Sequence, residues 1–204
     1  PGLRGGDPIG HTVGKREQDP PTGPGRTGTG WASRLRVVDL CNVIAGPTVG
    51  AMLARFGAEV TNIQPVTPAI DPWMNIVFGL RAHAGKKSAL VDLKTDAGQE
   101  ILFGLLEVAD VLTLNATSPQ QGRLGLDLDD LQRRFPRLVI LALDAFGGPT
   151  RRGKYRDYLG YDELGQAMTG IMARFGGGIQ KAELHAQVGA IDAMTGIWSL
   201  FATT

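Results

Sequence analysis

The feature that most constrains the fold is an alternation of short apolar runs with longer segments of helical periodicity. The runs are typical of buried strands: RVVDL (36–40), EVTNIQ (59–64), SALVDL (88–93), DVLTLN (110–115) and RLVILALD (137–144). In the helical segments, apolar residues recur at intervals of three and four, as at Val49, Met52, Leu53 and Phe56. Strands that alternate with helices predict an α/β fold, a Rossmann-like parallel sheet flanked by helices.

The remaining elements follow from caps and breakers. Thr95 and Asp127 are expected to start helices before the fourth and fifth strands, and the Pro-rich segment 65–85 is expected to be irregular. The run 137–144 is apolar almost throughout, which predicts a central strand. Two helices are expected after it, over 162–175 and from Asp192 onward. Their predicted inward-facing residues are Leu164, Met168, Ile171, Met172 and Phe175 in the first, and Met194, Ile197, Trp198 and Phe201 in the second.

Residues 1–34 differ from the rest of the chain, since they hold nine of the 29 glycines and five of the 12 prolines. Such a segment has little to bury, so we expect a flexible tail or linker over 1–34 and a folded domain over 35–204.

Composition and scattered residues exclude several function classes. The formal net charge of +1 predicts no nucleic-acid or acidic membrane surface, and no apolar run approaches the length of a membrane span. We also expect no signal segment. The one cysteine, Cys41, fits a reducing cytoplasm and is expected to be a buried apolar residue. The three histidines are dispersed, so no metal site is predicted, and no phosphate-binding or dinucleotide-binding glycine motif lies between a strand and a helix.

Ligands of parallel sheets bind beyond the carboxyl ends of the strands, which points to 41–47, 115–125 and 144–162. A separate candidate is Asp192, the one charged residue of the segment GAIDAMTGIW (189–198). Its position fits two roles: a helix cap, because Asp is a preferred N-cap residue, or a reactive carboxylate.

Five segments carry a resemblance to a known family: RVVDLCNVIAGPTVGAMLARFGAEV, GKKSALVDLKTDAGQEIL, ADVLTLNATSPQQGRLGL, YLGYDELGQAMTGIM and GAIDAMTGIW. In this order and spacing the chain resembles the class III CoA-transferases, a superfamily that includes formyl-CoA, carnitine-CoA and bile-acid-CoA transferases and α-methylacyl-CoA racemases. The likeness runs over 35–204 and corresponds to the N-terminal half of one family unit, with wording most similar to the two-copy members.

The resemblance implies roles for nine residues. Asp192 falls on the covalent nucleophile, which would form an anhydride and then an aspartyl-CoA thioester. Tyr161 falls where transferases commonly carry Tyr and racemases a His that shuttles a proton, and Asp162 is expected only to cap its own helix. The residues implied to contact CoA are Val43, Ile44, Ala45, Lys86, Lys87, Asn115 and Arg123. Lys86 and Lys87 are equally compatible with solvated surface lysines. At Pro65 and Leu159 the chain lacks basic residues that the family often has.

The implied activity is transfer of CoA from an acyl-CoA to a carboxylic acid acceptor. No tightly bound cofactor is expected, and the protein is expected to form a homodimer, as the family does. Three alternatives stay open: an acyl-CoA racemase, a transferase-lyase that uses the same covalent step, and a non-catalytic structural or dimerisation module. The racemase is disfavoured because Tyr161, with an ordinary pKa near ~10, is a poor second base.

Overall fold

The computed structural model describes residues 30–68, 70–147, 154–185 and 189–203. Within them, five parallel strands form one sheet in the order β3-β2-β1-β4-β5. The strands are β1 (Arg36–Asp39), β2 (Glu59–Gln64), β3 (Lys87–Leu90), β4 (Val111–Leu114) and β5 (Val139–Ala142). The chain runs outward from β1 to β3, returns beside β1 as β4 and continues to β5. The direction therefore switches between β1 and β4, the place where sheets of this kind bind ligands.

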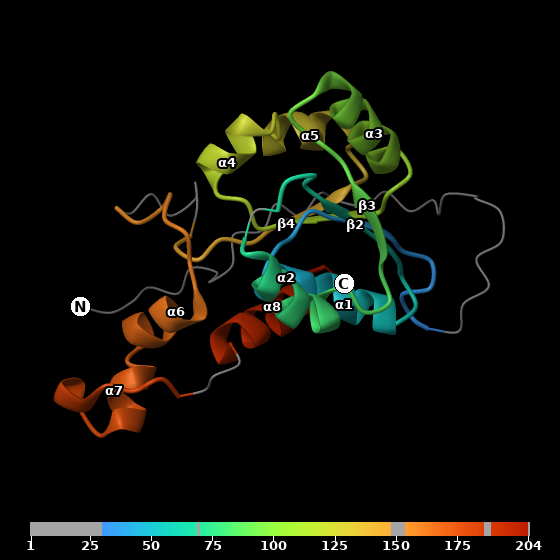
Figure 1. Cartoon of the computed structure of the whole chain (residues 1–204). Coiled ribbons are helices and arrows are strands. Elements are labelled where there is room, and N and C mark those ends of the chain that lie inside the picture. Colours follow the sequence, from blue (N-terminus) through green and yellow to red (C-terminus); the bar gives the residue numbers. More distant parts are fainter. Residues whose placement is uncertain (1–29, 69, 148–153, 186–188, 204) are drawn as a thin grey trace.

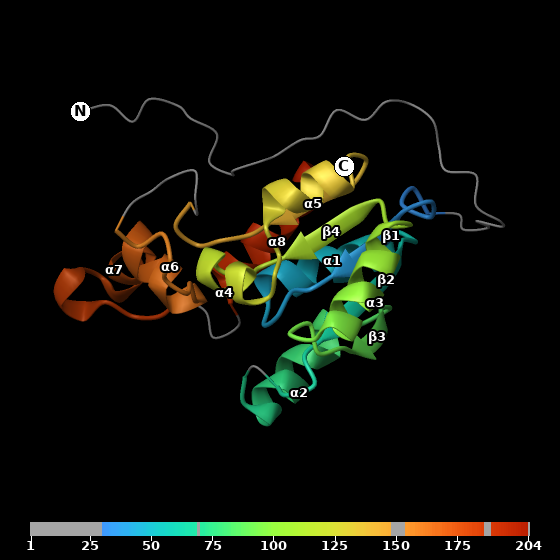
Figure 2. The same cartoon turned by 90° about the horizontal axis from the view of Figure 1, so that it is seen from above.

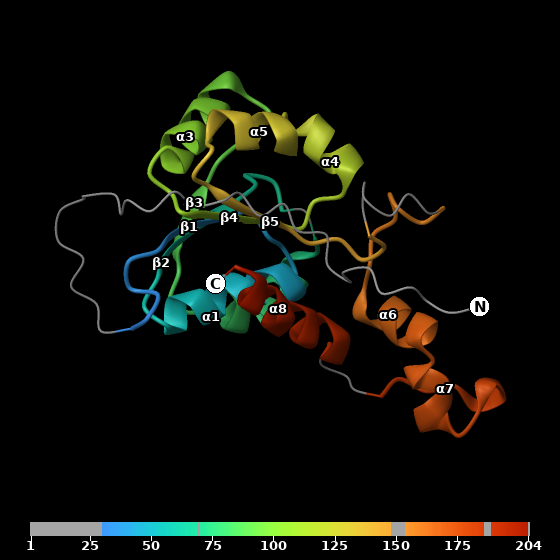
Figure 3. The same cartoon turned by 180° about the vertical axis from the view of Figure 1, so that it is seen from behind.

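Helices cover both faces of the sheet (Figures 1 and 3). One face carries α3 (Asp96–Leu106), α4 (Ser118–Arg123) and α5 (Leu128–Arg134), and the other carries α1 (Ala45–Arg55), α2 (Pro72–Ala82) and α8 (Ala190–Ala202). To one side lie α6 (Asp162–Thr169), α7 (Ile171–Gly176) and a 3-10 turn (Ile179–Lys181), as Figures 1 and 2 show. The predicted α/β class, a parallel Rossmann-like sheet flanked by helices, is confirmed.

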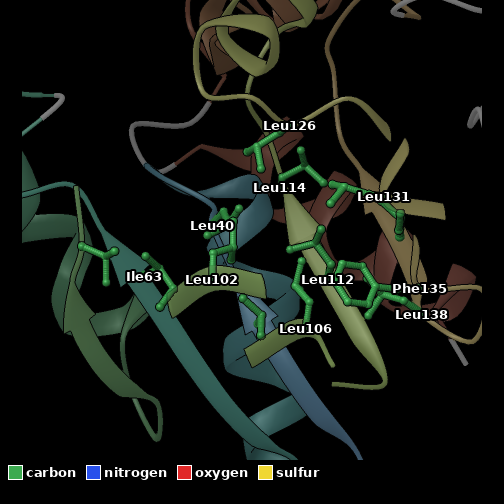
Figure 4. Close-up of a cluster of buried hydrophobic side chains, with 13 residues drawn as sticks. Leu40, Ile63, Leu102, Leu106, Leu112, Leu114, Leu126, Leu131, Phe135 and Leu138 are labelled. Atoms are coloured by element: carbon green, nitrogen blue, oxygen red, sulfur yellow. The ribbon is translucent and has the colours of Figure 1, made fainter. Parts of the chain in front are cut away.

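Successive side chains along a strand point to opposite faces of the sheet and so belong to two separate hydrophobic cores, as expected for a sheet covered on both faces. Val38 and Leu112 point to the α3 and α5 side, where they meet Leu102 and Phe135 (Figure 4). Their neighbours Val37 and Val111 point to the opposite side, where the partners are Val49, Leu53 and Leu200. Both helical layers therefore pack on β1 and β4.

The expected central position of strand 137–144 is wrong, because β5 pairs only with β4 and lies at the edge of the sheet. Its apolar sequence has another cause. Ile140 belongs to one core and Leu141 to the other, so the strand is buried on both faces although it is not central.

The segment 65–85 contains a helix where irregular structure was expected. Asp71 caps α2 by accepting a hydrogen bond from the backbone N–H of Trp73 (2.9 Å), and Pro72 occupies the first helical position. Proline is favourable there because that N–H has no helical partner. The prolines of this segment thus start the helix instead of preventing it.

The expected helix 162–175 is divided at Gly170, which adopts a left-handed conformation (φ 79°) and separates α6 from α7. Its predicted inward-facing side chains are partly wrong as well. Leu164, Met168 and Phe175 are 44 %, 62 % and 56 % exposed. Helical periodicity identified an apolar face correctly, but the described residues do not cover that face.

The last helix begins at Ala190 with Gly189 as its N-cap, so the expectation that Asp192 starts or caps it is wrong. Its buried face is Gly196, Ser199 and Leu200, which pack on α1. The predicted buried stripe is exposed instead; it consists of Met194, Ile197, Trp198 and Phe201.

Packing begins before the expected boundary at Leu35. Ala32 is fully buried, its N–H donates to the Phe56 carbonyl (3.1 Å), and the rings of Trp31 and Phe56 lie 5.2 Å apart. The expected flexible segment otherwise lies outside the described residues. Among the described helices, none combines the length and hydropathy that a membrane span needs.

Candidate active site

Three helices begin at the same place, beyond the carboxyl ends of β1 and β4. Gly189, just before α8, adopts φ 66°, and a Cβ at that position would lie 3.0 Å from Ile44 Cδ1 and 3.6 Å from Asp192 Cβ. The backbone N–H of Asp192 donates to Asp162 Oδ1 at the start of α6 (2.9 Å). The structure therefore brings together three residues that the sequence placed far apart: Ile44, Asp162 and Asp192.

Close contact between α8 and α1 fixes this geometry. A Cβ at Gly196 would lie 2.6 Å from the Ala45 carbonyl oxygen and 2.7 Å from Thr48 Cβ, so only glycine permits the observed approach. Asp192, one helical turn before Gly196, is thereby held beside residues 43–45, the loop that leads from β1 into the first residue of α1 (the 43–45 loop).

Asp192 is a half-buried carboxylate with an unusual titration. It occupies the third position of α8, and none of the described residues donates a hydrogen bond to its side chain. Burial, together with the nearby carboxylates of Asp162 and Glu163, raises its pKa from 3.8 to about 6. The carboxylate is therefore neither a cap of its own helix nor part of an ion pair with a described residue.

Asp162 does not cap its own helix as expected, because Tyr161 occupies the cap position of α6. The Asp162 side chain is buried and serves α8 instead, through the Asp192 N–H. Its second oxygen accepts a hydrogen bond from Gln166 Nε2, and the side-chain Oε1 of Gln166 accepts the backbone N–H of His185 (2.9 Å). Sequence reasoning missed Gln166. The i, i+4 spacing of the two polar residues in a helix was the available signal.

Tyr161 lies beside this network with its ring about half exposed and no side-chain hydrogen bond to the start of α6. Tyr161 precedes two of the three carboxylates that we call the acidic cluster, namely Asp162, Glu163 and Asp192.

The 43–45 loop connects β1 to α1 and is partly exposed throughout. Val43 has φ 71°, the only non-glycine residue with positive φ among those described. The loop borders a small hollow at the carboxyl ends of β1 and β2, lined by Cys41, Asn42, Val43, Gln64, Phe78 and His83, among others. Cys41 is buried, as expected, and burial raises the pKa of its thiol well above its ordinary value.

The hollow's histidine has an inner ring nitrogen without a partner. His83 Nδ1 is buried and receives no hydrogen bond from the described residues. Burial of the ring, and secondarily the nearby Lys86 ammonium, lowers the His83 pKa. His83 is therefore a neutral wall of the hollow at pH 7.

The two adjacent lysines have opposite environments. Lys86 is 1 % exposed, pairs with the buried Asp39 carboxylate at 2.6 Å and donates to the Pro47 carbonyl (2.9 Å). Lys87 is exposed, pairs with Glu59 and lies toward the amino ends of the strands. Lys86 thus supports the first turn of α1 from beneath. Neither ammonium faces the acidic cluster.

Asn115 follows β4, and its carboxamide makes two hydrogen bonds to the backbone of Asn42. The Asn42 N–H donates to Asn115 Oδ1 (3.0 Å), and Asn115 Nδ2 donates to the Asn42 carbonyl (2.7 Å). Arg123 ends α4 and is exposed. The expected CoA-contacting residues therefore do not form one cluster. Only Val43, Ile44, Ala45 and Asn115 gather at the switch between β1 and β4. Among the described residues, no three His, Cys, Asp or Glu side chains, those of the acidic cluster included, are placed so that they could hold one metal ion.

The sequence is similar to that of several known proteins over most of its length. The sequence profile of CoA-transferase family III matches residues 33–204. CoA-transferase/lyase DddD of Marinomonas sp. (strain MWYL1) is 43 % identical over 170 residues, which are 83 % of this chain and 20 % of that protein. Succinate--glutarate CoA-transferase of Agrobacterium fabrum is 32 % identical over 184 residues, 83 % of this chain and 45 % of that protein.

Solved structures give the same picture. A CAIB/BAIF family protein from Brucella suis superposes with a TM-score of 0.69 at 29 % identity, over 83 % of this chain and 47 % of that one. A hypothetical protein from Mycobacterium tuberculosis gives a TM-score of 0.69 at 29 % identity, over 82 % and 47 %. The chain thus spans about half the length of these relatives, and one fifth of the transferase/lyase.

Proposed function

Because the chain belongs to CoA-transferase family III, we propose that the protein transfers coenzyme A from an acyl-CoA thioester to an acceptor carboxylic acid, with Asp192 as the covalent nucleophile. The observation that carries this proposal is the Asp192 carboxylate. It is half-buried, accepts no hydrogen bond from the described residues, and lies where the 43–45 loop meets the start of α6.

The proposed reaction needs only a carboxylate and the two substrates. An Asp192 oxygen attacks the thioester carbonyl, the C–S bond breaks, and a mixed anhydride and the CoA thiolate result. The thiolate attacks the Asp192 carbonyl of the anhydride, which releases the donor acid and leaves an aspartyl-CoA thioester. The acceptor carboxylate attacks this thioester, and the released thiolate then attacks the acceptor's acyl carbon. This last step forms the CoA thioester of the acceptor and regenerates the free Asp192 carboxylate, with no net proton or electron required.

The environment of Asp192 suits this role. A pKa of about 6 leaves the carboxylate ionised at neutral pH, while partial burial removes water that would weaken it as a nucleophile. We propose that unpaired backbone N–H groups in the first turns of α1 and α8 stabilise the negative charge that develops on the attacked oxygen; the Asp192 N–H is not one of them, because it donates to Asp162. Tyr161, in place of a histidine, favours transfer over racemisation, because a phenol is a poorer proton shuttle than an imidazole.

We propose that CoA approaches over the 43–45 loop, with Val43, Ile44 and Ala45 in contact through backbone and shape. The exposed Arg123 is available for a phosphate group. Because the Lys86 ammonium is already bound to Asp39 and to the Pro47 carbonyl, we propose that it supports the first turn of α1 and does not bind a phosphate. We place the protein in the cytoplasm as a homodimer; the single buried thiol and the exposed apolar side of α8 support these two assignments.

A transferase-lyase is the second candidate, favoured by the 43 % identity to a relative named CoA-transferase/lyase. Both candidates use the same covalent step at Asp192. Product analysis distinguishes them, since a lyase releases an unsaturated acid and a transferase releases the donor acid unchanged.

The covalent step is tested by trapping. The protein is incubated with an acyl-CoA and then with hydroxylamine, and the peptide that contains Asp192 is examined by mass spectrometry. We expect a hydroxamate at Asp192, a gain of about 15 Da. The matched control is Asp129→Asn, an exposed aspartate in the first turn of α5, which should label normally, whereas Asp192→Asn should not. An unlabelled Asp192 in a preparation that binds CoA contradicts the proposal and favours a non-catalytic module.

A further inference from the structure

The side chain of Asn115 continues the pairing of β1 with β4 beyond the point where the two backbones separate. The Leu40 N–H donates to the Thr113 carbonyl at 2.8 Å, one residue past the end of β1. Two residues further along each strand, Asn115 Oδ1 accepts the Asn42 N–H (3.0 Å) and Asn115 Nδ2 donates to the Asn42 carbonyl (2.7 Å). One carboxamide thus replaces a strand peptide as both donor and acceptor, at the switch point of the sheet.

The residue after this clamp is strained. Val43 has φ 71°, a region that a β-branched residue avoids because its side chain collides with its own backbone. Such a conformation persists only when its surroundings hold it on both sides. Asn42 is held by Asn115, and the Ile44 carbonyl accepts hydrogen bonds from the Thr48 backbone (2.9 Å) and hydroxyl (2.8 Å).

The strained turn sets the direction of the next residue. Ile44 reaches the start of α8, where a Cβ at Gly189 would lie 3.0 Å from Ile44 Cδ1 and 3.6 Å from Asp192 Cβ. If Val43 relaxed to negative φ, the backbone of Ile44 would turn away from this junction. The position of the loop relative to Asp192 therefore depends on what holds Val43.

We propose that Asn115 is a positioning residue: its clamp on Asn42 keeps Val43 in the left-handed conformation and so presents the 43–45 loop to CoA beside Asp192. This proposal rests on the proposed function, because it assumes that the loop borders CoA. It differs from the expectation that the Asn115 side chain contacts CoA itself, since both of its polar atoms already bind Asn42.

A double-mutant cycle separates the two roles. Glycine adopts φ near 70° without strain, so Val43→Gly removes the need for a clamp, whereas Val43→Ala keeps a Cβ and most of the strain. We expect Asn115→Ala to weaken CoA binding, measured by calorimetry, by roughly tenfold, the equivalent of one or two hydrogen bonds. In the Val43→Gly background the same substitution should cost about threefold or less, while in the Val43→Ala background the loss should stay near tenfold.

Thermal unfolding of the same variants provides the second readout. Asn115→Ala should lower Tm, and Val43→Gly should reduce that loss. If Asn115→Ala does not fold, Asn115→Asp replaces it in the cycle, because it keeps the acceptor for the Asn42 N–H and loses the donor to the Asn42 carbonyl.

The outcomes are distinct. An equal loss of CoA affinity in all three backgrounds would show direct contact and overturn the proposal. Coupling in Tm without any loss of CoA affinity would show a purely structural clamp, which also overturns it. If the unsubstituted protein does not bind CoA, the proposed function fails. The coupling in Tm then still decides whether Asn115 holds Val43.

Discussion

Two buried carboxylates, one in the sheet and one at the start of α6, have very different partners. Asp39 ends β1 and meets the Lys86 ammonium at 2.6 Å, with both side chains at most 1 % exposed. Asp162 is also buried, yet its partners among the described residues are the Gln166 amide and the Asp192 backbone N–H. The sheet balances its buried charge with a cation. The region of α6 and α8 holds its buried charge with dipoles alone.

The difference distinguishes a sheet whose buried carboxylate is paired with a cation from a helical region whose carboxylates have no described cation beside them. Apolar exposure does not distinguish the two regions. Large apolar side chains of α6, α7 and α8 are exposed, namely Met168, Phe175, Trp198 and Phe201, but α2 on the sheet also exposes Trp73 (74 %) and Leu80 (82 %). Burial raises the Asp192 pKa most, and the carboxylates of Asp162 and Glu163, which no described cation neutralises, raise it further. Uncompensated charge costs stability and is typical of sites where activity limits stability.

The largest effect is expected at the buried ion pair. Lys86→Met removes the cation and leaves Asp39 charged inside the sheet, which should lower the free energy of unfolding by about 3–5 kcal/mol. Lys87→Met is the matched control, since its exposed pair with Glu59 should contribute only about 0–1 kcal/mol. Urea denaturation of both variants measures the difference. Equal losses would mean that the sheet does not depend on this cation.

Local sequence patterns predicted the sheet well because its elements bury their own periodic faces. All five strands, the helix that contains Val49, Met52 and Leu53, and the helices after Thr95 and Asp127 appear where local sequence patterns placed them. The position of β5 was not predictable in this way, because burial on both faces occurs at an edge as well as in the centre once helices cover both sides. Strand order depends on topology, which a hydrophobic run does not encode.

Local sequence patterns predicted the region of α6, α7 and α8 less well, for a physical reason. Apolar periodicity shows that a helix face avoids water but does not identify what covers it, so the face that contains Trp198 was wrongly assigned to the core. The bond from Asp192 to Asp162 spans 30 residues, and no local signal reports such a contact. The family resemblance pointed to Asp192, and the i, i+4 spacing from Asp162 could have indicated Gln166, but the clamp of Asn115 on Asn42 spans 73 residues and became visible only in three dimensions.

A smaller effect is expected where the two regions touch. Gly196→Ala places a methyl group 2.6 Å from the Ala45 carbonyl oxygen, so α8 must move away from α1, at a cost of about 1–3 kcal/mol. Gly104→Ala in α3 is the control, because no atom lies within 4 Å of its added Cβ, and it should stabilise by up to about 1 kcal/mol. Unfolding experiments on both variants, with CoA binding measured in parallel, test whether this contact also positions Asp192. A fully stable Gly196→Ala protein would show that α8 is not held by this approach.

The smallest effect is expected at Asp192, in the dependence of stability on pH. Its pKa is about 6 in the folded protein and 3.8 ordinarily, so the folded state binds the proton more tightly. Stability therefore falls as pH rises from about 4 to about 6, and the loss persists above that range. Asp192→Asn removes the ionisation, so it should increase the free energy of unfolding at pH 7–8 by on the order of 1 kcal/mol, a figure reduced for solvent screening of a half-exposed group.

The gain from Asp192→Asn should shrink as pH falls below about 6 and disappear below about 4, where the carboxyl group is protonated in both states. Asp129→Asn is the matched control. It also removes a carboxylate from the first turn of a helix, but from an exposed position, so it isolates the contribution of the helix N-terminus. Chemical denaturation from pH 4 to pH 8 on the three proteins measures both differences. A gain that stays constant across this range would mean that attraction to the start of α8 offsets burial and the acidic cluster, and the contrast between the two buried carboxylates would then carry no consequence for Asp192.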